Sequence, residues 1–160
     1  MKVLIVYDSE YGNTELIAGA VAEALREFGG VRAVPVDQAH PAQIQGVDVL
    51  IVGCPTQGWR PTPPIRSFLE GISAEEIRGL VVACFDTRFR MPRWMTGSAA
   101  EVMAGKLREK DVSLLVPPES FFVKGKRGPL RDGELDRAAT WARMLAEEAE
   151  LSHRATLRQL

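Results

Sequence analysis

The sequence predicts an α/β fold in which a doubly wound, five-stranded parallel sheet carries helices on both faces. Three observations lead to this prediction. The chain has 160 residues, which is the size of one ordinary domain. Apolar runs of strand length alternate along it with segments of helical periodicity. Several of the strand-like runs are apolar on both faces, which is favourable only in a sheet that is covered on both sides.

Five strands are expected from the apolar runs. They span residues 3–7, 31–36, 47–52 and 80–85, and 112–116 together with 120–123 form the fifth. Pro117 and Pro118 interrupt this last strand, because proline has no N–H group to give to a sheet. Crossovers between parallel strands are right-handed, so the intervening helices are expected to cover the sheet.

Helices are expected between the strands, over residues 13–28, 64–69, 97–110 and 133–151. In the first of them apolar residues recur at steps of three and four from Leu16 to Phe28, and Gly29 and Gly30 end it. The domain is therefore expected to span residues 1–151. Residues 152–160 are polar with scattered leucines, and we expect a frayed tail there, with a partner-binding extension as the alternative.

Composition narrows the class of protein. The net charge of −1 gives no global electrostatic argument for binding nucleic acid or a membrane. No apolar run approaches the roughly 20 residues of a membrane helix, and the N-terminus lacks the cleavage region of a signal peptide. Two cysteines cannot form a disulfide scaffold at this size, and His40 and His153 have no partners at metal-ligand spacing. These features predict a cytoplasmic protein without a metal site.

The loop after the first strand is the first candidate for a binding site, because open parallel sheets bind ligands beyond the carboxyl ends of their strands. It runs directly into the first helix as Asp8-Ser9-Glu10-Tyr11-Gly12-Asn13-Thr14. A helix N-terminus favours phosphate, and a glycine lets the backbone approach an anion closely. The alternative is that Asn13 or Thr14 only caps the helix. The loop lacks the lysine of a P-loop and the glycine pattern of dinucleotide folds, which argues against nucleoside triphosphates and NAD.

The run from Ile5 to Thr14 resembles the phosphate-loop signature of flavodoxins, and the order of strands and helices agrees with that family along the whole chain. The resemblance implies the strand order 2-1-3-4-5, with FMN at the switch between the first and third strands. It implies that the backbone from Glu10 to Thr14 holds the FMN phosphate without a formal positive charge. Because the loop offers one terminal-phosphate cradle, we expect FMN rather than FAD. The cofactor contacts predicted here are Ser9, Glu10, Tyr11, Gly12, Asn13 and Thr14.

The loop that ends the third strand resembles the flavodoxin loop covering the inner face of the flavin ring. Gly58 matches a glycine whose peptide rotates to bond flavin N5, and Thr56 matches a ribityl or ring contact. Gln57 and Trp59 depart from the family, which often has an aromatic residue or Met before this glycine and an acidic residue after it. Trp59 either stacks on the ring from a shifted position or packs on the neighbouring helix. The contacts predicted here are Pro55, Thr56, Gln57, Gly58 and Trp59.

The end of the fourth strand resembles the second flavin loop of the family. Asp86 matches an aspartate whose neighbouring backbone forms hydrogen bonds with the pyrimidine edge of the flavin. Phe89 matches the outer stacking aromatic, although a buried loop anchor is an alternative role for it and Trp94 an alternative outer cover. The contacts predicted here are Cys84, Phe85, Asp86, Arg88 and Phe89.

Arginines distinguish this chain from typical flavodoxins, which are acidic around the flavin. Arg88, Arg90 and Arg93 lie in the second flavin loop, and Arg60 and Arg66 follow the first. Guanidinium groups near the ring are expected to favour the anionic reduced flavin and to suit an acidic partner protein or an anionic substrate. The alternative is that these arginines are solvated and without functional consequence.

The basic turn over residues 124–129 is expected to be a solvated loop, with a phosphate contact as the alternative. The leading hypothesis for function is FMN-dependent electron transfer, so an electron carrier is preferred to a substrate-specific enzyme. One alternative is an FMN-dependent oxidoreductase that acts on a quinone or a porphyrinogen-like substrate. The other is a binding module that has lost its flavin.

Overall fold

The computed structural model describes residues 1–160 and contains one five-stranded parallel sheet. The strands lie in the order β2-β1-β3-β4-β5. They are β1 (Lys2–Tyr7), β2 (Gly30–Pro35), β3 (Val49–Pro55), β4 (Val81–Phe89) and β5 (Glu119–Val123). The chain therefore winds outward in one direction from β1 to β2 and in the other from β3 to β5. This confirms the predicted fold class and strand order, and it places the switch point between β1 and β3.

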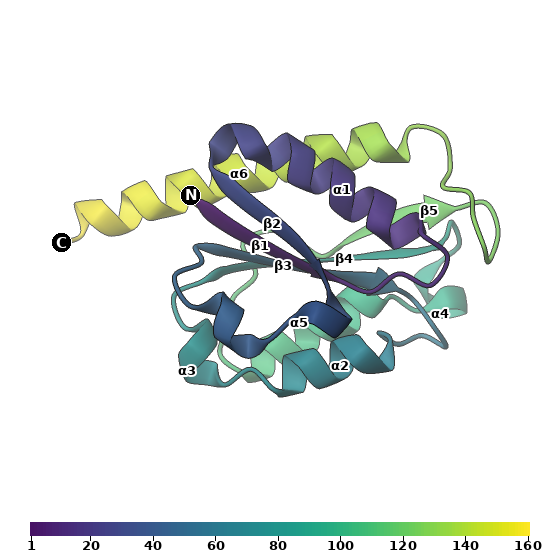
Figure 1. Cartoon of the computed structure of the whole chain (residues 1–160), viewed down its shortest axis with the longest axis horizontal. Coiled ribbons are helices and arrows are strands. Elements are labelled where there is room, and N and C mark those ends of the chain that lie inside the picture. Colours follow the sequence, from purple (N-terminus) through teal and green to yellow (C-terminus); the bar gives the residue numbers. More distant parts are fainter.

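Helices cover both faces of the sheet (Figure 1). The pair α1 (Asn13–Leu25) and α6 (Glu134–Arg158) packs on one face. The other face carries α2 (Pro63–Glu70), α3 (Ala74–Ile77) and α5 (Ala99–Glu109). The short helix α4 (Arg93–Thr96) follows β4. Single 3-10 turns complete the chain at Arg26–Phe28, Val36–Gln38 and Pro41–Ile44.

Alternation along the central strands builds two cores, one on each face. In β1, Ile5 faces α1 and α6, whereas Leu4 faces the helices of the other side, because successive side chains of a strand point in opposite directions. Phe85, Phe121 and Trp141 meet edge to face with ring centroids 5.9–6.0 Å apart. Trp141 therefore packs in the core, and the three rings hold β4 and β5 against α6.

The fourth and fifth strands differ from the prediction. Strand β4 continues through Phe89, so the expected second flavin loop is largely strand, and its last residues pair with β5 from Phe85 with Glu119 to Phe89 with Val123. Residues 112–116 are not a strand, since only Leu114 forms an isolated bridge, to Val82. Burial of Val112 and Val116, rather than a ladder of backbone hydrogen bonds, holds this segment beside β4.

The last helix also runs further than expected. It continues past Leu151 to Arg158, so the frayed tail predicted for residues 152–160 is wrong as a description of the backbone. Residues 151–160 are all exposed, and this end of α6 projects past the sheet (Figure 1). None of the helices combines the length and apolarity that crossing a bilayer requires.

Candidate functional site

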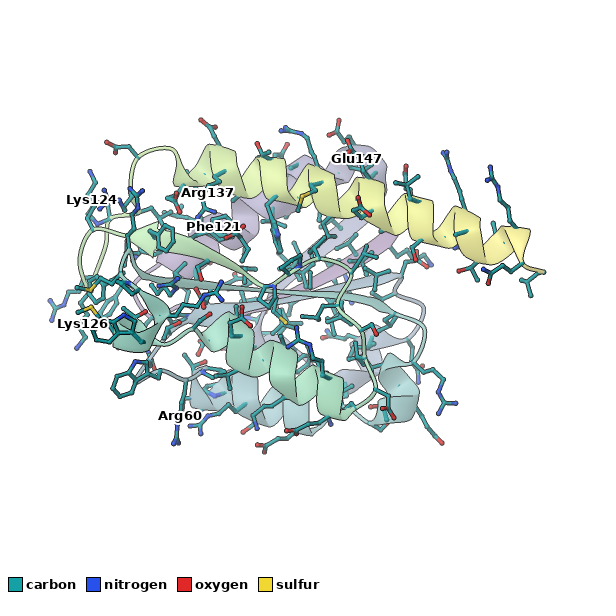
Figure 2. All side chains as sticks on the ribbon, turned by 180° about the vertical axis from the view of Figure 1, so that it is seen from behind. Arg60, Phe121, Lys124, Lys126, Arg137 and Glu147 are labelled. Atoms are coloured by element: carbon teal, nitrogen blue, oxygen red, sulfur yellow. The ribbon has the colours of Figure 1, made fainter.

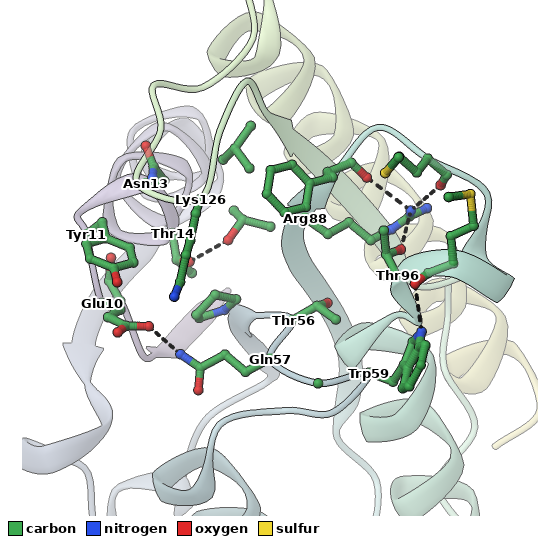
Figure 3. Close-up of a pocket in the computed structure, with 18 residues that line it drawn as sticks. Glu10, Tyr11, Asn13, Thr14, Thr56, Gln57, Trp59, Arg88, Thr96 and Lys126 are labelled. Atoms are coloured by element: carbon green, nitrogen blue, oxygen red, sulfur yellow. Dashed lines mark hydrogen bonds between the residues drawn. The ribbon is translucent and has the colours of Figure 1, made fainter.

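A cavity of about 690 Å³ opens at the carboxyl ends of β1, β3 and β4, where the switch point lies (Figure 3). Its walls come from the loops after β1 and β3, the end of β4, the segment through α4, and the turn after β5. The lining residues are Ser9, Glu10, Tyr11, Asn13, Thr14, Pro55, Thr56, Gln57, Gly58, Trp59, Thr87, Arg88, Phe89, Met91, Met95, Thr96, Val123 and Lys126.

The loop after β1 presents free backbone donors at the start of α1. Ser9 Oγ accepts hydrogen bonds from the N–H groups of Gly12 (3.1 Å) and Glu15 (3.2 Å), which holds the loop in a tight turn. Gly12 has φ of 91°, in the left-handed region that favours glycine. The N–H groups of Glu10, Tyr11, Asn13 and Thr14 donate to no acceptor in the chain. Free donors and the positive end of the helix dipole are the features that favour an anion at such a loop.

Thr14 joins this loop to β4. Its hydroxyl lies 2.8 Å from that of Thr87, and both side chains are buried yet reach the wall of the cavity. Only one of the two hydroxyl hydrogens is used between them, so the other can be donated to a ligand. Thr87 was not among the predicted site residues, although it stands between Asp86 and Arg88 in the motif at the end of the fourth strand.

The loop after β3 is a tight hairpin turn. Gln57 and Arg60 exchange backbone hydrogen bonds of 2.9 and 3.0 Å across it. Both central residues have positive φ, 53° for Gly58 and 65° for Trp59, as in the turns that close two-residue hairpins. The side chain of Gln57 donates to the Glu10 carboxylate at 2.5 Å and so ties this loop to the loop after β1.

Trp59 compensates for its unusual backbone with contacts to the segment around α4. Its indole N–H donates to the carbonyl of Met95 at 3.1 Å. The indole lies so close to Gly97 that a Cβ there would stand 2.2 Å from Trp59 Cδ1. The side chain remains 57% exposed. The tryptophan thus borders the cavity at its α4 end, away from the loop after β1 (Figure 3).

Arg88 is buried, at 8% exposure, and donates hydrogen bonds to acceptors from three segments of the chain. Its Nε donates to Ser120 Oγ at 2.9 Å, and one terminal nitrogen donates to Met91 O (2.7 Å) and Thr96 Oγ1 (3.1 Å). The guanidinium carbon lies 5.2 Å from the centre of the Phe122 ring. This arginine therefore fixes the segment before α4 as well as bordering the cavity.

Asp86 lies behind Arg88 and is completely buried. Its Oδ2 accepts from Ser98 Oγ (2.6 Å) and from the N–H of Ala100 (3.0 Å). Its Oδ1 has no hydrogen bond and lies 3.8 Å from Arg88 Nε. Burial raises the pKa of this carboxyl, opposed by the two hydrogen bonds and by the guanidinium.

Most of the predicted site residues line the cavity; the exceptions are Gly12, Cys84, Phe85 and Asp86. Gly12 shapes the turn behind the cavity wall. Cys84 faces the core under α5 and Phe85 the core under α1, because strand alternation turns both away from the loops. Burial raises the pKa of the Cys54 thiol to about 12 and also raises that of Cys84, so both thiols stay protonated and unreactive.

The predicted arginine cluster is divided by the structure. Arg88 alone of its three members lines the cavity. Arg90 is exposed and borders a second, smaller cavity beside β5, and Arg93 forms an ion pair of 3.1 Å with Glu101. The expectation that three guanidinium groups act together on one ligand ring is therefore not met, because only Arg88 borders the cavity.

Several lining residues were missed from the sequence. They are Thr87, Met91, Met95, Thr96, Val123 and Lys126. Lys126 belongs to the basic turn for which a solvated loop was expected, and the structure places it in the cavity wall instead. The three lysine and arginine residues of that turn suggested a phosphate contact as the alternative. The sequence could not show, however, that the turn lies close to the loop after the first strand.

Comparisons of the sequence and of the fold with known proteins point to one family. The sequence model of flavodoxins matches residues 5–88, just over half of the chain. A flavodoxin of Aquifex aeolicus is 33% identical over 91 residues, 54% of this chain and 49% of that protein. An NAD(P)H dehydrogenase (quinone) of Azorhizobium caulinodans is 34% identical over 99 residues, 49% of this chain and 50% of that protein. The chain thus spans about half the length of these two relatives.

A solved structure extends the likeness to the whole fold. A flavodoxin from the domain Archaea superposes with a TM-score of 0.78 and 20% identity, covering 94% of this chain and 99% of its own. Three findings point to the same family. They are the strand order, the loop with free N–H donors at the switch point, and the match of the flavodoxin sequence model over residues 5–88. The chain belongs to the flavodoxin family.

Proposed function

We propose that this protein binds FMN in the cavity at the switch point and acts as an electron carrier. The observation that supports this most strongly is the loop after β1, which leads into α1 with the N–H groups of Glu10, Tyr11, Asn13 and Thr14 free of any acceptor in the chain. A phosphate monoester is the natural acceptor for such a set of donors. Bound FMN would supply reversible electron transfer in one-electron steps.

The rest of the cavity fits the remainder of FMN. Its volume of about 690 Å³ falls in the range of ordinary cofactor sites. Thr56 and the Thr14–Thr87 pair offer hydroxyls between the phosphate loop and the opposite end. That opposite end is lined by the apolar side chains of Phe89, Met91 and Met95 together with Trp59. Polar donors at one end and apolar side chains at the other match a phosphate and an aromatic ring system.

The chain's own residues would position the cofactor and limit water around it. The hydrogen bond from Gln57 to Glu10 closes the gap between the loops after β3 and β1. The Trp59 indole N–H donates a hydrogen bond to the Met95 carbonyl and so joins the loop after β3 to the segment at α4. Arg88 places a permanent positive charge in the wall, which favours a ligand that becomes negative on reduction.

A partner with an acidic docking surface fits the end of the molecule where the cavity opens. Arg60 and Arg90 are exposed there and form no ion pair. Arg60, Lys124 and Lys126 all extend from this end, whereas α6 projects from the opposite one (Figure 2). Opposite charges speed the encounter of redox proteins. We propose that the protein itself works in the cytoplasm, as its sequence predicts.

A second candidate is a flavin oxidoreductase that acts on a small substrate such as a quinone. The observation that favours it is the apolar rim around α4, where Met91, Met95 and Trp94 are 45%, 43% and 79% exposed. A planar apolar substrate could rest on this rim beside the flavin. A flavin-free binding module is a third candidate, and the unused N–H donors of the loop after β1 argue against it.

Electron transfer with and without a substrate separates the carrier from the oxidoreductase. The FMN-loaded protein, reduced chemically under anaerobic conditions, is expected to pass electrons to a one-electron haem protein. With NAD(P)H and a quinone but no reductase, it is expected to be no faster than free FMN. Quinone reduction at about 1 s⁻¹ or faster, in the usual range of enzyme turnover, would instead support the oxidoreductase.

A further inference from the structure

The turn after β5 is held in shape by its own hydrogen bonds. The N–H of Lys124 donates to the carbonyl of Pro129 at 2.8 Å, and the N–H of Gly128 donates to that of Gly125 at 3.0 Å. The ammonium of Lys124 lies 3.4 Å from the Asp132 carboxylate. The turn is therefore ordered by the chain itself and holds Lys126 at its tip in a defined place.

This turn lies directly against the loop after β1. Gly128 approaches Asn13 so closely that a Cβ on the glycine would stand 2.6 Å from Asn13 Oδ1. The Arg127 guanidinium lies 5.8 Å from the centre of the Tyr11 ring. Two neighbours of Lys126 thus fasten the turn to the loop with the free N–H donors. Lys126 itself extends into the cavity in front of Thr14 (Figure 3).

The ammonium of Lys126 has no partner in the chain. It takes part in no hydrogen bond or ion pair, whereas Lys124, two residues earlier, is paired with Asp132. The one carboxylate in the cavity wall, that of Glu10, accepts a hydrogen bond from Gln57 instead. The cavity thus brings a free ammonium and free N–H donors to one end, where Glu10 is the only carboxylate and is turned to Gln57. The excess of donors favours an anionic ligand group there.

We propose that Lys126 binds the terminal phosphate of the ligand and makes the cavity selective for a phosphorylated flavin over an uncharged one. The inference rests on the proposed function, in which the loop after β1 holds the FMN phosphate. It departs from the uncharged phosphate site that the family resemblance implies. A phosphate monoester carries close to two negative charges at neutral pH, so the N–H donors and the ammonium share its charge.

The test compares Lys126→Met with Lys124→Met in the full chain freed of flavin. Both changes remove an ammonium from the same turn, but only Lys126 lines the cavity. FMN and riboflavin are titrated separately, with flavin fluorescence as the readout, at low and high salt. Thermal unfolding of both variants without flavin checks that the fold is retained.

Lys126→Met is expected to weaken FMN binding about tenfold at low salt, since a hydrogen bond between charged groups has that order of effect when partly exposed. Riboflavin binding should be unchanged, and the salt dependence of FMN binding should decrease. Lys124→Met should leave both ligands unaffected, and Lys126→Arg should restore most of the FMN affinity.

Two results would overturn the inference alone. Equal loss of FMN and riboflavin in Lys126→Met would mean that the lysine stem contacts the ring or ribityl chain. Unchanged FMN binding would mean that the ammonium stays in solvent. If the unmodified protein bound neither flavin, the proposed function would fail as well, and the two failures are therefore distinguishable.

Discussion

Replacing Arg88 with methionine is expected to lower the free energy of unfolding by about 3–5 kcal/mol, the usual cost of removing one partner of a buried pair. The change leaves the fully buried Asp86 without its only nearby cation. It also leaves Ser120 Oγ, Thr96 Oγ1 and the Met91 carbonyl without their donor. Urea unfolding of the protein without flavin measures the loss.

The matched control is Arg90→Met, two positions along the chain. Arg90 is exposed and forms no ion pair, so its replacement should change the free energy of unfolding by no more than about 0.5 kcal/mol. Adding Asp86→Asn to Arg88→Met should recover part of the loss, because the buried charge is then gone. A loss below about 1 kcal/mol for Arg88→Met would show that the guanidinium does not stabilise this region.

The Arg88→Met deficit should depend on pH with a definite sign. Burial raises the pKa of Asp86 in the folded protein, and losing the guanidinium raises it further. An acid with a raised folded pKa costs no stability below its unfolded value of about 3.9, and its cost grows as pH rises above that value. The deficit is therefore expected to be larger at neutral pH than near pH 4. A deficit that shrank with rising pH would contradict this assignment.

FMN is expected to bind at least about a hundredfold more tightly than riboflavin, since two hydrogen bonds to a charged group, at about 1.5–3 kcal/mol each, suffice for that ratio. The loop after β1 leaves more N–H groups free than this estimate needs. The two ligands share the ring and ribityl chain, so the ratio isolates the phosphate. Isothermal titration of the flavin-free protein measures it, and equal affinities would place the phosphate outside the loop.

A pair of glycine variants tests whether the geometry of that loop matters. Gly12 has φ of 91° and Gly19 lies inside α1, and a Cβ at either position meets no atom within 4 Å. Gly12→Ala therefore adds backbone strain of about 1–2 kcal/mol without a steric clash, and it should weaken FMN more than riboflavin. Gly19→Ala should leave both affinities unchanged. Similar effects of the two variants on FMN would argue against a role for the turn at Gly12.

The parts of the site that are contiguous in sequence were predictable. The loop from Ser9 to Thr14 directly follows an apolar strand and opens a helix, so local pattern alone indicated an anion site there. The five strands and their order followed from apolar runs and the rule for right-handed crossovers together with the family resemblance.

The parts that depend on tertiary neighbours were not predictable. Charged residues at the end of the fourth strand indicated a loop, yet Asp86 and Arg88 belong to β4. Strand β5 pairs with them, Asp86 accepts buried hydrogen bonds, and Arg88 donates one to Ser120. Lys126 lies far along the chain from Tyr11, and only the packing of its turn against the first loop brings it into the cavity. Helix α6 passes Leu151 although nothing in the chain covers its last residues.

The identity of the flavin that the purified protein carries or takes up tests the central claim most directly. The flavin is released by denaturation, separated by chromatography and quantified against the protein. The cradle of N–H donors after β1 predicts FMN at one equivalent per chain. Recovery of FAD, or failure to take up FMN at micromolar concentration, would contradict it.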